Sequence, residues 1–123
     1  MKDIHERTRA RNRLPNRRAG ETFTVEVGNL RYVVSVGRFA DGGLAEIFIS
    51  NGKAGSDSDT AGRDGAVVAS IALQYSVPLE VIRHALMRNR DGSACGPLGA
   101  ALDLLHEREA ACARADAEQA ACS

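Results

Sequence analysis

The sequence predicts a small α+β domain, in which a three-stranded antiparallel β-meander is followed by two to three helices packed on one face of the sheet. Three observations lead to this class. Apolar and polar residues alternate in short runs between residues 22 and 49, which is the period of half-buried strands. After residue 58 the apolar residues recur at helical spacing instead. The chain has 123 residues, 44% of them hydrophobic, so its length suits one domain with one core.

The sheet is predicted from three runs separated by two turns. Strands at residues 22–27 and 31–36 flank the turn candidate Gly28-Asn29-Leu30 and form a β-hairpin. Asp41-Gly42-Gly43 supplies residues that accept a positive φ at low cost, so it is predicted to be the second turn. The third strand follows at residues 44–49, which completes the meander.

The first helix is predicted at residues 60–75, lying across the sheet. Ser58-Asp59-Thr60 offers side-chain oxygens that could cap its N-terminus. Gly62 and Gly65 each cost a helix roughly 1 kcal/mol relative to alanine. They therefore indicate close packing, or less readily an approaching ligand. The apolar residues at helical spacing are Val67, Val68, Ile71, Ala72 and Tyr75.

Two further helices are expected after this one. Ser76-Val77-Pro78 ends the first helix and starts the second, which carries Leu79, Ile82 and Leu86 on one stripe. A turn is predicted at residues 89–93. Pro97 opens the third helix, and the alanine-rich stretch beyond residue 107 extends that helix or frays into solvent. The residues expected to point inward from this last helix are Leu98, Leu102 and Leu105.

The chain is predicted to have three parts: a basic flexible arm at 1–19, the α+β domain at 20–106 and a helical or frayed tail at 107–123. The formal net charge is zero, yet residues 1–18 hold seven basic and two acidic side chains. Such an arm can contact nucleic acid, an acidic partner or its own domain. A nucleic-acid-binding module is therefore one alternative function, in which phosphates are contacted by Arg9, Arg11, Arg13, Arg17 and Arg18.

The cysteines and histidines do not suggest a metal site or a disulfide framework. Cys95, Cys112 and Cys122 contain no CxxC pair and do not make an even set, which predicts a reducing compartment. No apolar run approaches the roughly 20 residues of a membrane span, and the N-terminus has charge where a signal peptide is apolar. We therefore expect a cytoplasmic protein without a membrane partner. The histidines, which lie in three separate segments, are His5, His84 and His106.

The loop at residues 51–56 is the main candidate for binding chemistry. It lies between a predicted strand and a predicted helix N-terminus, where free backbone N–H groups and the helix dipole favour an anion. It is not a Walker A loop, because Lys53 precedes the second glycine. The loop is read as a structural connection or as a nucleotide-phosphate site. The residues assigned to that site are Asn51, Gly52, Lys53, Gly55 and Ser56, with Arg38 and Arg63 as cations that could converge on it.

Three segments of the chain resemble the TSCPD domain, the module near the C-terminus of adenosylcobalamin-dependent ribonucleotide reductases that also occurs as short free-standing proteins. They are residues 14–18, 38–56 and 96–103, and the resemblance spans about three quarters of the chain. The signature Thr-Ser-Cys-Pro-Asp aligns near Ser93-Ala94-Cys95-Gly96-Pro97, where alanine replaces the serine and Gly96 precedes the proline. The position of Cys95 before a helix start could lower the pKa of its thiol and make it reactive, but a small buried residue is the favoured interpretation.

The resemblance implies a role in ribonucleotide reduction and deoxyribonucleotide supply for DNA synthesis. The protein is expected to be a free-standing accessory or ligand-binding module rather than a complete ribonucleoside-diphosphate reductase, with a reductase large subunit or a nucleotide as its partner. Adenosylcobalamin would belong to the larger reductase and not to this chain. The remaining alternative is a homodimeric interaction protein, which pairs through the sheet face that the helices leave uncovered.

Overall fold

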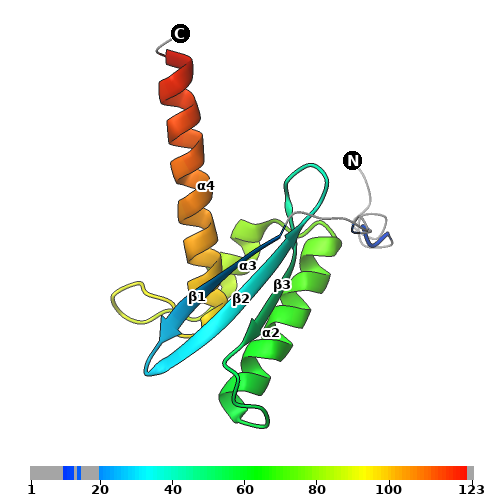
Figure 1. Cartoon of the computed structure of the whole chain (residues 1–123), viewed down its shortest axis with the longest axis vertical. Helices are drawn as coiled ribbons and strands as arrows, with labels where there is room; N and C mark the ends of the chain where they lie inside the picture. Colours follow the sequence, from blue (N-terminus) through cyan, green and yellow to red (C-terminus); the bar gives the residue numbers. More distant parts are fainter. Residues whose placement is uncertain (1–9, 13, 15–19, 122–123) are drawn as a thin grey trace.

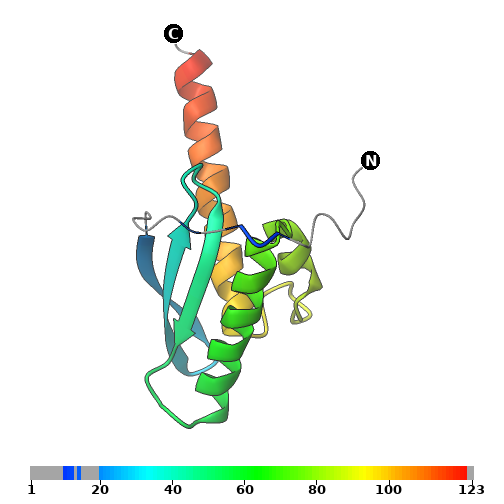
Figure 2. The same ribbon diagram turned by 90° about the vertical axis from the view of Figure 1, so that its right-hand side faces the viewer.

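The computed structural model describes residues 10–12, 14 and 20–121, and it confirms the α+β class. Among these residues, three antiparallel strands precede three helices (Figure 1). The helices lie on one side of the sheet (Figure 2). The elements are β1 (Gly20–Val27), β2 (Leu30–Arg38), β3 (Leu44–Ser50), α2 (Asp57–Gln74), α3 (Leu79–Ala85) and α4 (Pro97–Ala121).

The sheet is a meander with the order β1-β2-β3, as predicted. The β1–β2 turn contains Gly28 at φ 60°, a value that glycine adopts without steric cost. In the register, Val25 lies opposite Tyr32 and Val34 lies opposite Ile49. These four side chains are buried on the same face of the sheet, where they meet α2 and α4. The core therefore forms between the sheet and the helices.

Helix α2 buries a different face from the one that its apolar stripe suggested. Val67, Val68 and Ile71 are exposed, whereas the buried positions carry small or polar side chains. The reason is that α2 lies along β3, an edge strand whose outward backbone groups need hydrogen-bond partners. The buried residues of α2 are Asp59, Gly62, Ala66, Ala69, Ser70, Leu73 and Gln74.

Ser70 and Gln74 supply those partners. The Ser70 hydroxyl accepts a hydrogen bond from the Ile47 N–H at 2.9 Å and donates one to the Ile47 carbonyl at 3.0 Å. The Gln74 side-chain amide donates to the Ala45 carbonyl at 3.1 Å. Two polar side chains one helical turn apart thus cover the open edge of the sheet.

The start of α2 also differs from the prediction. The N-cap is Ser56 rather than a residue of the Ser58-Asp59-Thr60 segment, and its hydroxyl accepts a hydrogen bond from the Asp59 N–H. Gly62 is buried, and a Cβ there would lie 3.4 Å from the Ile49 Cγ2 atom, an ordinary van der Waals distance. The expectation that Gly62 is needed for close packing therefore stays a prediction.

Helix α4 contacts β1 with its first half and extends beyond the sheet with its second half (Figure 1). Leu102 and Leu105 are fully buried and Leu98 packs against the core, so the inward positions are confirmed. From Ala111 onward every described residue of α4 is exposed. In the part of the chain that the structure describes, no helix is both long enough and apolar enough to cross a membrane.

Candidate functional site

The loop at residues 51–56 is organised around the carboxylate of Asp59. This side chain is only 2% exposed, although it lies in the first turn of α2. One of its oxygens accepts hydrogen bonds from the Asn51 N–H at 2.9 Å and from the Ser50 hydroxyl at 3.0 Å. The other oxygen accepts from Nε of Arg63 at 2.7 Å. The carboxylate of Asp59 thus accepts hydrogen bonds from the backbone N–H, hydroxyl and guanidinium groups that could otherwise bind an external anion.

The hydrogen bonds at this loop also affect the charge state of Asp59. The N–H of Asn51 and then the Arg63 guanidinium lower the pKa of Asp59, against the effect of burial. The ionised form is therefore the stable one at neutral pH. The rest of the loop is closed by local bonds, since the Lys53 N–H donates to the Asn51 side chain and the Ser56 hydroxyl donates to the Lys53 carbonyl.

Of the two arginines assigned to the loop, the structure brings only Arg63 to it. Arg63 also donates to the Ser50 hydroxyl at 2.9 Å. Arg38 pairs with Leu44 at the opposite end of β3 from Ser50. There it donates to the carboxylate of Glu21 at 3.0 Å. The predicted convergence of Arg38 on the loop is therefore wrong, because the antiparallel register separates the two ends of the strand.

The nucleotide site at this loop stays a prediction, and a thermal-shift titration tests it. A bound phosphate has to compete with Asp59 for the same donors, so we expect weak binding, with a dissociation constant of about 1 mM. At 5 mM nucleotide the stabilisation would then be at most about 1 kcal/mol. Lys53→Ala should remove this rise in Tm, and Lys2→Ala is the control for loss of a lysine elsewhere. An unchanged Tm with ribo- and deoxyribonucleotides would contradict the site.

The basic arm is described at only one of its five assigned arginines. Arg11 donates through Nε to the side-chain oxygen of Gln74, and the neighbouring Asn12 N–H donates to the Gln74 carbonyl at 2.7 Å. This part of the chain thus contacts the C-terminal end of α2. The other arginines proposed to contact nucleic acid lie outside the described residues: Arg9, Arg13, Arg17 and Arg18.

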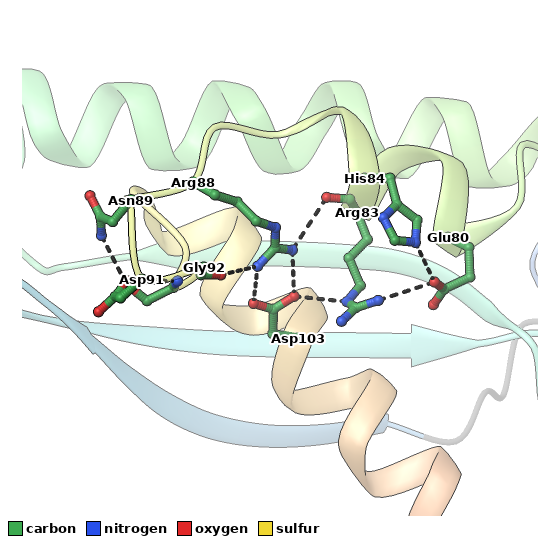
Figure 3. A network of polar contacts seen from close by, with 9 residues as sticks. Glu80, Arg83, His84, Arg88, Asn89, Asp91, Gly92 and Asp103 are labelled. Atoms are coloured by element: carbon green, nitrogen blue, oxygen red, sulfur yellow. Dashed lines mark hydrogen bonds and ion pairs between the residues drawn. The ribbon is translucent and has the colours of Figure 1, made fainter.

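A second polar cluster joins α3, the loop at residues 86–96 and α4 (Figure 3). The Asp103 carboxylate of α4 accepts two hydrogen bonds of 2.7 Å from Arg88, one on each oxygen from a different terminal guanidinium nitrogen. It also accepts one of 2.8 Å from Nε of Arg83. The hydrogen bond from Arg88 lowers the pKa of Asp103, burial opposes it, and Arg83 lowers it further. Arg88 also donates to the Gly92 carbonyl at 3.0 Å. One carboxylate therefore holds the loop against two helices.

Glu80 extends this cluster and brings two of the predicted separate histidines together. Its carboxylate lies 3.1 Å from Nε2 of His84 and 2.8 Å from Nδ1 of His106. Burial opposes ionisation of Glu80, but His106 and Arg83 lower its pKa overall. Among residues 10–12, 14 and 20–121, no group of three or more His, Cys, Asp and Glu side chains is placed to hold a metal ion.

The loop held by Asp103 carries the signature segment at residues 93–97. Asn89 and Ser93 close a turn through a 2.8 Å hydrogen bond between their backbones, as predicted for residues 89–93. The interpretation of Cys95 as a buried residue is wrong. Cys95 is exposed on this surface loop, where its thiol donates to the Asn89 side-chain oxygen at 3.2 Å. The loop rests closely on α4, since a Cβ on Gly99 would lie 2.9 Å from the Cβ of Ala94.

An apolar groove of about 380 Å³ opens beside this segment. Met87 stands at the groove with 79% of its surface exposed. Sequence reasoning missed this feature, since Met87 was not assigned to any stripe or motif. The one sequence signal for an exposed Met87 was its position between Leu86, the last residue of the predicted apolar stripe, and the turn predicted at residues 89–93. The lining includes Ala61, Gly62, Leu86, Met87, Cys95 and Pro97.

A family model described as the TSCPD domain matches residues 6–115. The chain is also similar to proteins named Vitamin B12-dependent ribonucleotide reductase. It is 41% identical over 73 residues to the one from Agrobacterium fabrum, and 38% identical over 72 residues to the one from Bradyrhizobium diazoefficiens. It is 35% identical over 80 residues to the one from Rhodopirellula baltica.

These matches cover 58–65% of the chain but only 6–8% of the reductases' own length. No solved structure gives a significant match to the chain. The similarity is thus to one short segment of much longer proteins.

Proposed function

Since this chain belongs to the TSCPD domain family, we propose that it serves as an accessory docking module for a B12-dependent ribonucleotide reductase. The observation that carries the proposal is the similarity to a single short segment of those reductases. In this proposal the cobalamin and the reduction chemistry stay with the larger protein. The module would then act in deoxyribonucleotide supply for DNA synthesis.

The groove at Met87 supports a docking role. Met87, 79% exposed, borders a groove that is lined mainly by apolar side chains, and contiguous apolar surface of this kind marks a site that a partner can cover. Methionine also adapts its shape to a partner, because it is unbranched and polarizable. The supporting loop is held in place by the bonds of Arg88 to Asp103, so the partner does not have to order it. We therefore assign the groove as the surface for the reductase.

Binding of the full chain to the B12-dependent reductase of the same organism tests this proposal. Met87→Lys should weaken the association about tenfold or more, because it places a charge in the centre of an apolar contact. The matched control is Val81→Lys, which makes the same kind of change at an exposed apolar side chain of α3 outside the groove. Biolayer interferometry measures both variants against the immobilised reductase.

Two results would contradict the proposal. One is the absence of any association at micromolar concentrations. The other is an association that Met87→Lys leaves unchanged, which would show that the groove is not the contact surface. Circular dichroism of both variants confirms that each is folded before binding is compared.

A further inference from the structure

The face of the sheet opposite the helices carries an apolar patch that the core does not use. In an antiparallel sheet with one wet face, the outward positions are normally polar. Here Val33 of β2 and Phe48 of β3 point outward and are 47% and 55% exposed. Val67 of α2 borders them, is 52% exposed, and lines the same shallow hollow. We call Val33, Phe48, Val67 and Ile71 the open-face patch.

The patch continues along α2, which lies beside β3. Ser70 contacts Ile47 and Gln74 contacts Ala45, while Asp59 contacts Asn51. The helix therefore runs antiparallel to the strand. Because Val67 and Ile71 are one turn apart on the same side, Ile71 extends the patch toward the beginning of β3.

Charged side chains of opposite sign flank the two ends of this patch. At one end, Arg63 is hydrogen-bonded to Ser50, which lies two residues after Phe48. At the other end is Glu46, two residues before Phe48, with its side chain lying over Gly37. Arg63, which is also paired with Asp59, and Glu46 thus place a cationic and an anionic side chain on either side of Phe48 along the strand.

We propose that the open-face patch binds a second copy of this chain through a two-fold axis near Phe48. With the axis lying between the two faces and running across the strands, the strand direction is reversed, so the Arg63 end of one copy meets the Glu46 end of the other, twice. The two phenylalanine rings meet at the axis, where aromatic pairs add to apolar burial. This pairing goes beyond the proposed docking to a reductase, because it uses the opposite surface.

The charge balance of the face favours a second copy over nucleic acid. The charged side chains at this face include Glu26, Arg31, Glu46 and Arg63, and Arg31 lies 3.6 Å from Glu26 on the same face. Binding of a phosphate backbone needs an excess of cations. A self-paired surface instead needs both signs, so that unlike charges meet across the axis, and both signs are present here.

Sedimentation equilibrium of the full chain tests the proposal. We expect a monomer–dimer equilibrium for the wild type, and for Phe48→Lys a dissociation constant raised roughly 100-fold or more, since two lysines would meet at the axis. Val67→Lys should act in the same direction. Met87→Lys, on the other surface, should leave the dimer unchanged and serves as the matched control.

A cross-linking experiment locates the axis independently. With Cys95, Cys112 and Cys122 replaced by serine, Phe48→Cys should form a covalent dimer on oxidation, whereas Met87→Cys should not. A wild type that stays monomeric at several hundred micromolar would overturn the proposal, as would a dimer that survives Phe48→Lys. Loss of reductase binding in Phe48→Lys would instead assign the patch to the reductase and would also overturn it.

Discussion

Replacing Asp103 by asparagine should lower the Tm of the domain and loosen the loop at residues 86–96. The Asp103 carboxylate accepts three hydrogen bonds from Arg83 and Arg88. An asparagine has one oxygen to accept with, and its NH2 group would face guanidinium donors. We expect a loss of about 1–2 kcal/mol, because charge-assisted bonds are strong but this carboxylate is partly open to solvent.

The effect should be visible in two measurements. For a domain of this size, that loss corresponds to a fall in Tm of roughly 5–10 °C. Hydrogen exchange should speed up at the N–H groups of Asn89 and Cys95, which bond across the loop. Asp116→Asn, on the exposed half of the same helix, should change neither. Faster exchange in both variants would place the effect in α4 as a whole rather than in the cluster.

The same substitution should change how stability depends on pH. Since the pKa of Asp103 is lowered in the folded chain, its ionised form stabilises the fold above the unfolded value of about 4, and this contribution is lost as the pH falls through the folded pKa. The difference in Tm between wild type and Asp103→Asn should therefore be largest near pH 7 and shrink toward pH 3. A difference that stays constant over this range would contradict the role assigned to the charge.

Replacing Ser70 by alanine should destabilise the domain still more. The hydroxyl is the partner of both the N–H and the carbonyl of Ile47, at a site that is almost fully buried. A buried backbone group without a partner costs about 1–3 kcal/mol, and here two groups lose theirs. Thermal denaturation should show a fall in Tm on the order of 10 °C. Urea denaturation should show a lower midpoint concentration.

The control for this prediction is Thr60→Ala, which removes a hydroxyl from the exposed side of the same helix. It should have little effect on Tm. Because an uncovered strand edge pairs readily with other chains, Ser70→Ala should also aggregate faster on heating. If Ser70→Ala were as stable as the wild type, the polar face of α2 would not be what covers β3.

The candidate sites were predictable only where the information was local. Asn51 to Ser56 were correctly placed between a strand and a helix, because turn and capping signals lie within a few residues of one another. The sequence predicts Asp59 only as a possible capping residue, so it does not predict that the Asp59 carboxylate accepts hydrogen bonds from Asn51 and Arg63. Asp103 was missed as well, because its arginine partners lie 15 and 20 positions away in the sequence.

The order and type of the elements were determined by the sequence itself. Alternation with a period of two and recurrence with a period near 3.6 are properties of neighbouring residues, so the meander and the three helices could be predicted without tertiary contacts. The buried face of α2 was decided only in the tertiary structure. The unpaired backbone of β3 selects Ser70 and Gln74 over the more apolar stripe, and this leaves Val67 and Ile71 in water. Hydrogen-bonding demand at an edge strand thus outweighed side-chain hydropathy, because Ser70 and Gln74 satisfy three backbone groups of β3, and each of these left unsatisfied would cost about as much free energy as the burial of one apolar side chain provides.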